Sequence, residues 1–371
     1  MFRNLKLEKY RSFDSYELSD LTRVNLLVGK NNCGKTSILE AVNLLVSGGS
    51  PSVIEQGADR RGEMNVREDP EPYGTQAVPD VSHLFFGRVV EPGVGLHLSS
   101  NDDTRSLSIE FADVDDVTED ADHREIDGML SLFGEDTSDV LALVTKVDGR
   151  SSTPFLPVSE DGSVLAMPRS RRMRLKNVPA APVVQFVTAE SLYPESMRGA
   201  WDKVLADGRE SDVVEALRIL DGELDTIHFL THGFFRGPSE RAGVLVGLRT
   251  GQRVPLGSCG DGMRRLLALS LSVVRAADGF VLIDEIDTGL HWTAMEETWR
   301  LIVTAARRSN VQVFATTHSY DCVRGLATLV ESFPDLAPEV SIQKIDRLLG
   351  QAVSLDADKI RIALAQDMEV R

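Results

Sequence analysis

The hydrophobic pattern divides the chain into strands and helices that alternate. Short apolar runs bounded by turn residues are typical of strands that are buried on both faces. Four such runs lie at residues 24–28, 183–187, 280–283 and 311–315. Helical spacing of apolar residues follows at 36–46, at 292–308 and beyond residue 320. Because strands that alternate with helices form a mostly parallel sheet, the pattern predicts an α/β fold.

Shorter elements complete the expected architecture. Two strand-like runs at 2–7 and 15–18 flank a polar turn around Arg11, and the runs at 244–248 and 254–256 are typical of a hairpin. The other expected elements are helical segments between 190 and 230, a helix at 263–275, two strand-like runs after 339 and a helix at 357–365.

Residues 49–180 differ in composition from the rest of the chain. They are rich in Gly, Pro, Asp and Ser and contain several short apolar runs. This pattern predicts a small, mainly antiparallel sheet with long loops. We therefore expect one domain over residues 1–371, in which 1–48 and 181–371 form the core and a helical lobe, and 49–180 form an inserted β-rich subdomain.

The composition excludes several classes of protein. The chain has 371 residues, of which 42% are hydrophobic and 26% are charged, as in ordinary globular proteins. No apolar run approaches the roughly 20 residues that span a bilayer, and the first residues are too polar for a signal peptide. We expect a cytoplasmic protein with no membrane contact. The three cysteines are far apart, which argues against a zinc site.

The charge is distributed unevenly along residues 49–180. The net charge of −17 disfavours nonspecific binding to nucleic acid, which needs a local basic patch. Residues 102–125 are strongly acidic, and residues 169–176 are strongly basic. Either segment serves as a solvated face or as a binding patch. The basic residues that would contact DNA are Arg169, Arg171, Arg172, Arg174 and Lys176.

The sequence GKNNCGKTS has the spacing of a phosphate-binding loop. It follows a predicted strand and precedes a predicted helix, which is the context that the GxxxxGK[ST] pattern requires. Backbone N–H groups and the helix N-terminus would face the phosphates. Lys35 would reach the β- and γ-phosphates of ATP, and Thr36 would hold Mg²⁺. The expected nucleotide contacts are Gly29, Asn31, Asn32, Cys33, Gly34, Lys35, Thr36 and Ser37.

Two later strands end in residues that suit phosphate chemistry. Asp284 and Glu285 follow the strand at 280–283, at the edge where ligands bind in open α/β sheets. Asp284 is placed to hold Mg²⁺, and Glu285 to orient or deprotonate water. Glu285 can act only if the strand has ended, and Gly289 marks that turn. His318 follows the next strand and would hydrogen-bond the γ-phosphate.

A second glycine-rich loop, LGSCGDGMRRLL, precedes the helix at 263–275. Its glycines allow backbone N–H groups to approach an anion closely, and the helix adds its positive end. A helix N-cap is the simpler alternative. The loop, the phosphate loop, LIDEIDTGLH and VQVFATTHSYDCV together resemble ABC-type ATPases of the SMC, RecF and OLD (overcoming lysogenisation defect) branch. The compact members without a Toprim nuclease domain are the most similar.

This resemblance implies a head-to-tail dimer that sandwiches two ATP molecules. Ser258, Gly260 and Gly262 would then contact the ATP that the second copy binds. This chain has Ser-Cys-Gly-Asp-Gly where transporters have Ser-Gly-Gly-Gln. The resemblance also places Arg11 near the nucleotide and leaves Gln185 and Glu190 as alternatives for the Q-loop residue.

ATP hydrolysis is the reaction that these motifs predict, and its use remains open between two main hypotheses. The first is a switch or sensor for a separate nuclease or toxin effector in anti-phage defence, as in OLD-like systems. The second is a RecF-like or SMC-like DNA-binding ATPase of repair or recombination. A transporter subunit fits less well because of the insert, and a metabolic kinase would need a substrate motif in place of the second loop.

Overall fold

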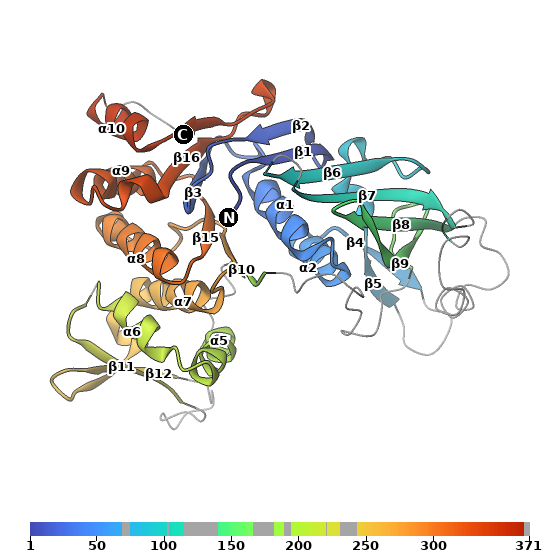
Figure 1. The fold of residues 1–371 in the computed structure, drawn as a ribbon. Helices are drawn as coiled ribbons and strands as arrows, with labels where there is room; N and C mark the ends of the chain where they lie inside the picture. Colours follow the sequence, from blue (N-terminus) through green and yellow to red (C-terminus); the bar gives the residue numbers. More distant parts are fainter. Residues whose placement is uncertain are drawn as a thin grey trace.

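A six-stranded sheet forms the centre of the molecule (Figure 1). The computed structural model describes residues 1–68, 75–101, 104–114, 117, 140–165, 182–188, 194–219, 221–230 and 243–366. The strands, in spatial order, are β10 (Val184–Val187), β14 (Phe280–Ile283), β15 (Gln312–Thr316), β3 (Val24–Val28), β16 (Val340–Lys344) and β17 (Val353–Leu355). Neighbours are parallel from β10 to β16, and β17 is antiparallel to β16. The predicted α/β fold with a mostly parallel sheet is confirmed.

Both faces of this sheet are buried, as its continuous apolar strands require. Val281 and Ile283 of β14 face one hydrophobic cluster, whereas Phe280 and Leu282 face another. Helices surround the sheet, some in direct contact with it and others packed on those helices. They are α1 (Lys35–Ser47), α2 (Pro51–Arg61), α5 (Pro194–Ala206), α6 (Glu210–Leu217), α7 (Asp261–Arg275), α8 (Met295–Arg308), α9 (Tyr320–Ser332) and α10 (Ala357–Ala365).

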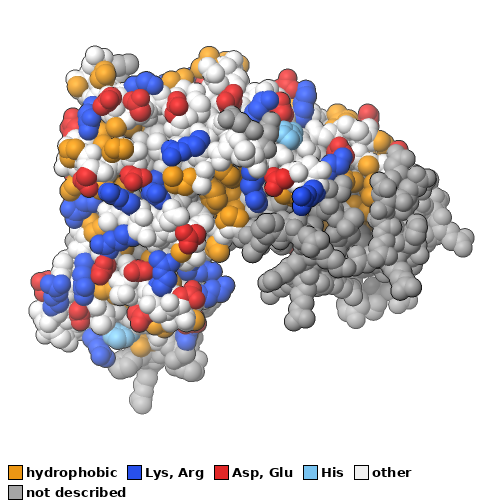
Figure 2. Space-filling model, in the orientation of Figure 1, with side chains coloured by type: hydrophobic (Ala, Val, Ile, Leu, Met, Phe, Trp, Pro, Cys, Tyr) orange, Lys and Arg blue, Asp and Glu red, His pale blue; other side chains and the backbone are white. Residues whose placement is uncertain are grey.

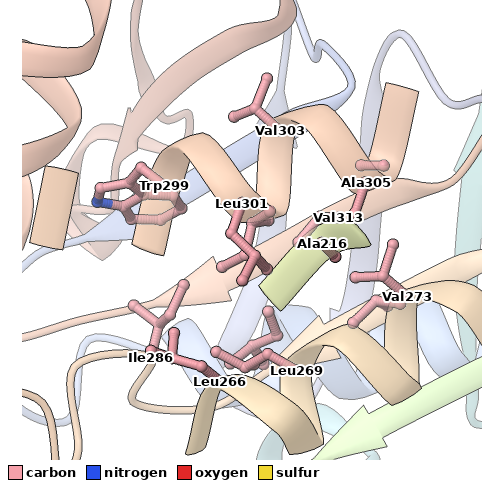
Figure 3. Close-up of a cluster of buried hydrophobic side chains, with 14 of the residues drawn as sticks. Ala216, Leu266, Leu269, Val273, Ile286, Trp299, Leu301, Val303, Ala305 and Val313 are labelled. Atoms are coloured by element: carbon pink, nitrogen blue, oxygen red, sulfur yellow. The ribbon is translucent and has the colours of Figure 1, made fainter. Parts of the chain in front are cut away.

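The helical lobe packs on the face of Val281 and Ile283. In Figure 3, Leu266 and Leu269 of α7 and Leu301 of α8 belong to this buried cluster. A three-stranded sheet of β11 (Leu224–Phe229), β12 (Val244–Leu248) and β13 (Arg253–Pro255) completes the lobe. Helix α7 therefore runs from the second glycine-rich loop into the buried core.

An antiparallel sheet lies on the opposite side of α1 (Figure 1). Its strands, in spatial order, are β2 (Phe13–Leu18), β1 (Leu5–Tyr10), β6 (Gly95–Ser100), β7 (Arg105–Asp113), β8 (Val140–Val147) and β9 (Arg150–Ser159). The sheet predicted within residues 49–180 therefore includes the amino-terminal hairpin, since β1 pairs with β6. The proposed boundary at residue 48 divides this sheet and remains a prediction.

Helix α1 is the layer between the two sheets. Ile38 and Leu45 of α1 share one buried cluster with Leu282 and Phe314 of the central sheet and Leu107 of the antiparallel sheet. Gly48 ends the helix in the left-handed conformation, as the Gly48-Gly49 pair predicts. The phosphate-loop helix is therefore fixed on both sides by apolar packing.

Two elements differ from the sequence-based expectation. Helix α2 was not predicted, because the composition of residues 49–180 indicated strands and loops. Pro51 in its first turn and Gly62 at its C-cap are the local signals for it. Strand β11 occupies the end of the 190–230 segment, where helical patterns were expected, because Leu224–Phe229 pairs with β12. In the described ranges, no helix is both long and apolar enough to cross a bilayer.

Candidate nucleotide-binding site

The phosphate loop connects the end of β3 to the first residue of α1. Gly34 has φ +101°, and a Cβ atom there would lie 2.4 Å from the Phe13 ring. Gly29 has φ +145°, and its Cβ would lie 2.6 Å from the carbonyl oxygen of Ile345. Both positions therefore require glycine for space as well as for conformation. The loop leads directly into the N-terminus of α1, whose positive end favours a bound anion.

Lys35 begins α1 at the end of this loop and contacts the turn that follows β15. Its side chain is buried, and Nζ donates to the carbonyl oxygens of Gly29 at 2.8 Å and Lys30 at 2.9 Å. Nζ also lies 3.4 Å from Nδ1 of His318. Burial lowers the pKa of Lys35, although Asp284 and Glu285 act to raise it. The structure thus brings together two residues that the sequence predicted for one site.

Asp284 links three chain segments at the carboxyl edge of the sheet. Its carboxylate Oδ1 accepts a hydrogen bond from Oγ1 of Thr36 at 3.2 Å and one from Oγ1 of Thr316 at 2.6 Å. Its backbone N–H donates to the carbonyl of Val187 at 3.1 Å. The ends of β10, β14 and β15 therefore meet at the start of α1.

The oxygen donors at this junction fit Mg²⁺. A hydroxyl and a carboxylate are the groups that this ion uses together with phosphate oxygens and water. Within the described residues, no group of three or more His, Cys, Asp or Glu side chains could hold a metal ion. A Mg²⁺ ion here would depend on Thr36, Asp284, water and nucleotide phosphates, as expected for an ion that arrives with its nucleotide.

Glu285 occupies a sharp turn directly after Asp284. Strand β14 ends at Ile283, and Glu285 has φ +50°, in the left-handed region. Its backbone N–H donates to Oγ1 of Thr316 at 2.9 Å, and its exposed carboxylate accepts from Thr288 at 3.3 Å. The expectation that the strand ends before Glu285 is confirmed. The exposed carboxylate thus lies on a turn beyond the strand end.

Hydrogen bonds also fix the turn that carries His318. Oγ1 of Thr317 donates to Asp287 at 2.5 Å and accepts the backbone N–H of Ser319 at 2.9 Å. Ser319 caps α9, since its hydroxyl accepts from the N–H of Cys322 at 3.3 Å. His318 is therefore held between a strand end and a helix start.

The second glycine-rich loop is exposed and separate from the phosphate loop. Ser258 lies in a 3₁₀ turn, Gly260 has φ +88°, and α7 begins at Asp261. Both Ser258 and Gly260 are exposed. In the part of the chain that the structure describes, no hydrogen bond or ion pair joins Ser258, Gly260 or Gly262 to the phosphate loop. The loop is thus available to another molecule.

Arg11 is enclosed by carboxylates beside α1. It pairs with Glu63 at 2.8 Å and with Glu40 of α1 at 3.0 Å, and only 7% of its side chain is exposed. Arg61 of α2 also binds Glu40 and donates to the hydroxyl of Ser37 at 3.1 Å. Arg11 therefore contacts the phosphate-loop helix through Glu40, and a direct contact to nucleotide stays a prediction.

Gln185 lines a neighbouring cleft of about 700 Å³ between α2 and the helical lobe. Its amide donates to the carbonyl of Val184 at 3.0 Å. The guanidinium of Arg60 lies 4.0 Å above the Phe186 ring in the same cleft. The alternative Q-loop residue, Glu190, lies outside the described residues, as do the five basic residues between 169 and 176.

Sequence reasoning missed the supporting residues rather than the motifs. Thr316, Glu40 and Arg61 each contact a predicted site residue, but none belongs to a recognisable spacing pattern. For Thr316, the hydroxyl residues at the end of the strand were the available signal. Arg61 of α2 pairs with Glu40 of α1. Because α2 was not predicted, this contact could not be expected from the sequence.

Several known proteins are similar to this chain. An ATP/GTP phosphatase of Helicobacter pylori (strain ATCC 700392 / 26695) is 20% identical over 352 residues, which cover 89% of this chain and 88% of that protein. The DNA replication and repair protein RecF of Stenotrophomonas maltophilia (strain R551-3) is 44% identical over 62 residues, or 16% of this chain and 17% of RecF.

Solved structures that align with this fold include SMC head domains. The SmcHead bound to the C-winged helix domain of ScpA aligns with 96% of this chain and 99% of its own, at a TM-score of 0.48 and 14% identity. The SMC head domain from Thermotoga maritima aligns with 96% of this chain and 98% of its own, at a TM-score of 0.42 and 12% identity.

A family model covers most of the chain, including every motif of the site. The model described as "AAA domain, putative AbiEii toxin, Type IV TA system" matches residues 24–321. This range contains the phosphate loop, the second glycine-rich loop, the Asp284 turn and His318. The chain belongs to this family of AAA-type ATPases.

Proposed function

We propose that the chain binds Mg²⁺–ATP where β3, β14 and β15 end and hydrolyses it with water. The observation that carries this proposal is the Asp284 carboxylate, which accepts hydrogen bonds from both Thr36 and Thr316. The hydrogen bond from Thr36 places the carboxylate of Asp284, at the end of β14, beside the first turn of α1. Thr36 and, through water, Asp284 would hold Mg²⁺, which neutralises phosphate charge when it is bound.

The side chains of the site divide the work of phosphoryl transfer. This reaction depends mainly on positioning and charge stabilisation. Lys35 binds the β- and γ-phosphates, and His318, which lies 3.4 Å from its Nζ, hydrogen-bonds the γ-phosphate. Glu285 orients or deprotonates the attacking water, because its exposed carboxylate extends from a turn beyond the strand end.

We further propose that two copies of the chain form a dimer in which each copy completes the ATP site of the other. Ser258, Gly260 and Gly262 of one copy bind the γ-phosphate of ATP held by the other. The exposure of the first two residues and the absence of bonds from the described loop to its own phosphate loop support this arrangement. The positive end of α7, a helix of 15 residues, adds a favourable field for an anion.

The dimer would serve as a switch or sensor for a separate effector, such as a nuclease or toxin, in anti-phage defence of the OLD-like type. The net charge of −17 favours this use over direct binding to DNA. On the face in Figure 2, described basic and acidic side chains are interspersed, which does not favour a polyanion there. The DNA-binding alternative is favoured by the local identity to RecF and by the basic run at 169–176.

Glu285→Gln should trap an ATP-bound dimer. The substitution removes the base but retains the size of the side chain, so we expect hydrolysis to fall about 100-fold or more while ATP binding persists. Light scattering with and without ATP measures the mass. Tryptophan fluorescence gives a second readout. Trp292, which follows the Glu285 turn, is 63% exposed, whereas Trp201 and Trp299 are buried. The fluorescence should therefore change at the same ATP concentration as the mass. A monomer that stays monomeric in saturating ATP contradicts the dimer.

A mixture of two inactive variants should recover activity if the second loop acts on its neighbour. Lys35→Ala removes ATP binding, and Ser258→Arg blocks the donated loop. A heterodimer then contains one intact composite site, so the mixture should hydrolyse ATP although each variant alone does not. Lys359→Ala, at an exposed lysine of α10, serves as a control for the loss of one lysine. If the mixture is as inactive as its components, the assignment in trans is wrong.

Duplex DNA should leave the ATPase rate nearly unchanged. We expect less than a twofold change at two salt concentrations, because the net charge of −17 repels the DNA phosphates. The comparison uses the natural chain and a variant with Arg171, Arg172 and Arg174 changed to Glu. Strong stimulation that is lost at high salt and in this variant would instead support the RecF-like function.

A further inference from the structure

Arg265 of α7 is a buried arginine whose donors are only partly used. Its side chain is 1% exposed. Nη2 donates to the backbone carbonyl of Glu285 at 3.0 Å and, more weakly, to that of Asp284 at 3.4 Å. Nε and Nη1 are also buried, and neither has a hydrogen-bond partner among the residues that the structure describes.

A buried arginine with unpaired donors lowers the stability of the folded protein. A guanidinium is always charged and carries five donors, and buried donors without partners destabilise a protein. Burial lowers the pKa of Arg265, and the carboxylates of Asp287, Glu285 and Asp284 offset part of this effect. An apolar side chain at this position would avoid the desolvation penalty. The hydrogen bond from Nη2 to the carbonyl of Glu285 is therefore the contact that indicates the role of Arg265.

That contact lies on the catalytic turn. Glu285 has φ +50°, a conformation that is unfavourable for residues other than glycine. Three groups hold the main chain of this residue, and one is Thr288 of the same turn, whose backbone N–H donates to the Glu285 carbonyl oxygen at 3.0 Å. The other two come from neighbouring elements. Thr316 of β15 accepts its backbone N–H at 2.9 Å, and Arg265 of α7 donates to its carbonyl oxygen at 3.0 Å. The main chain of Glu285 is thus held between the central sheet and α7.

The helix that supplies Arg265 begins at the second glycine-rich loop. Arg265 is the fifth residue of α7, one turn from Asp261 and close to the exposed Gly260. A shift of this helix end would move the guanidinium and, with it, the carbonyl of Glu285. Apolar residues farther along α7, such as Leu269 and Val273, are fixed in the core.

We propose that Arg265 is a positioning residue that links the second glycine-rich loop to the turn of Glu285. When that loop binds the nucleotide of a second copy, Arg265 holds the Glu285 main chain so that the carboxylate faces the attacking water. This inference rests on the proposed function, in which ATP is hydrolysed between two copies of the chain. Arg265 itself contacts neither ATP nor water.

The test compares Arg265→Met, Arg265→Lys and the control Arg275→Met. Met keeps an unbranched, flexible side chain but removes every donor, whereas Lys retains a charged ammonium that can donate to the carbonyl of Glu285. Arg275 is a half-buried arginine at the other end of the same helix. ATP affinity, hydrolysis rate at saturating ATP and melting temperature are measured for each purified variant.

Arg265→Met should lower the hydrolysis rate about 10- to 100-fold, since small displacements of a catalytic group have effects of this size. We expect ATP affinity to change less than about threefold and the melting temperature to stay equal or rise, because the unpaired buried charge is gone. Arg265→Lys should recover part of the rate, and Arg275→Met should keep the natural rate.

A double variant distinguishes a positioning role from general damage. If Arg265 acts through Glu285, Glu285→Gln and Glu285→Gln with Arg265→Met should hydrolyse ATP at the same residual rate. A natural rate in Arg265→Met, or a loss that parallels a fall in melting temperature, overturns the inference. If the natural chain itself binds but does not hydrolyse ATP, the proposed function fails instead.

Discussion

The carboxylate of Asp284 is the constraint on which the rest of the site depends. Its hydrogen bonds to Thr36 and Thr316 are possible only if β14 and β15 end at one level beside the start of α1. The register of the parallel strands sets that level, since Ile283 lies opposite Ala315 and Ala315 lies opposite Leu26. The hydrogen-bonded pairing of these parallel strands holds their ends at this level.

Packing around α1 extends this constraint through the molecule. The helix lies between the central sheet and the antiparallel sheet, and Glu40 binds Arg11 and Arg61 on its surface. The phosphate loop therefore leads into a helix that cannot tilt without disturbing the buried cluster that it shares with both sheets and the ion pairs of Glu40. On the opposite face, α7 carries the second glycine-rich loop. The phosphate loop and the second glycine-rich loop thus lead into different helices, α1 and α7. This separation fits the proposed site in which two copies of the chain each supply one loop.

The sequence predicted the motifs and the central sheet better than it predicted their supports. GKNNCGKTS and FVLIDEID combine a strict spacing with an apolar strand, so both residue identity and position follow from pattern. The contacts of Arg11 with Glu63 and of Arg265 with the carbonyl of Glu285 join residues far apart in the chain. No local periodicity encodes such contacts. The amino-terminal hairpin likewise pairs with β6 across a stretch of chain that includes β3, α1 and α2, so residues 49–180 could not be recognised as part of a shared sheet.

The most direct measurement concerns the dependence of ATP binding on Mg²⁺ in Asp284→Asn. In the natural chain, removing Mg²⁺ with EDTA should weaken ATP binding about tenfold or more, or ~1.4 kcal/mol. If Asp284 organises the ion with Thr36, the Asn variant should bind ATP with nearly the same affinity in both conditions. Asp358→Asn on α10, with an exposed carboxylate, should behave like the natural chain. An Asp284→Asn protein that retains the full Mg²⁺ effect would contradict the assignment of this junction as the centre of the site.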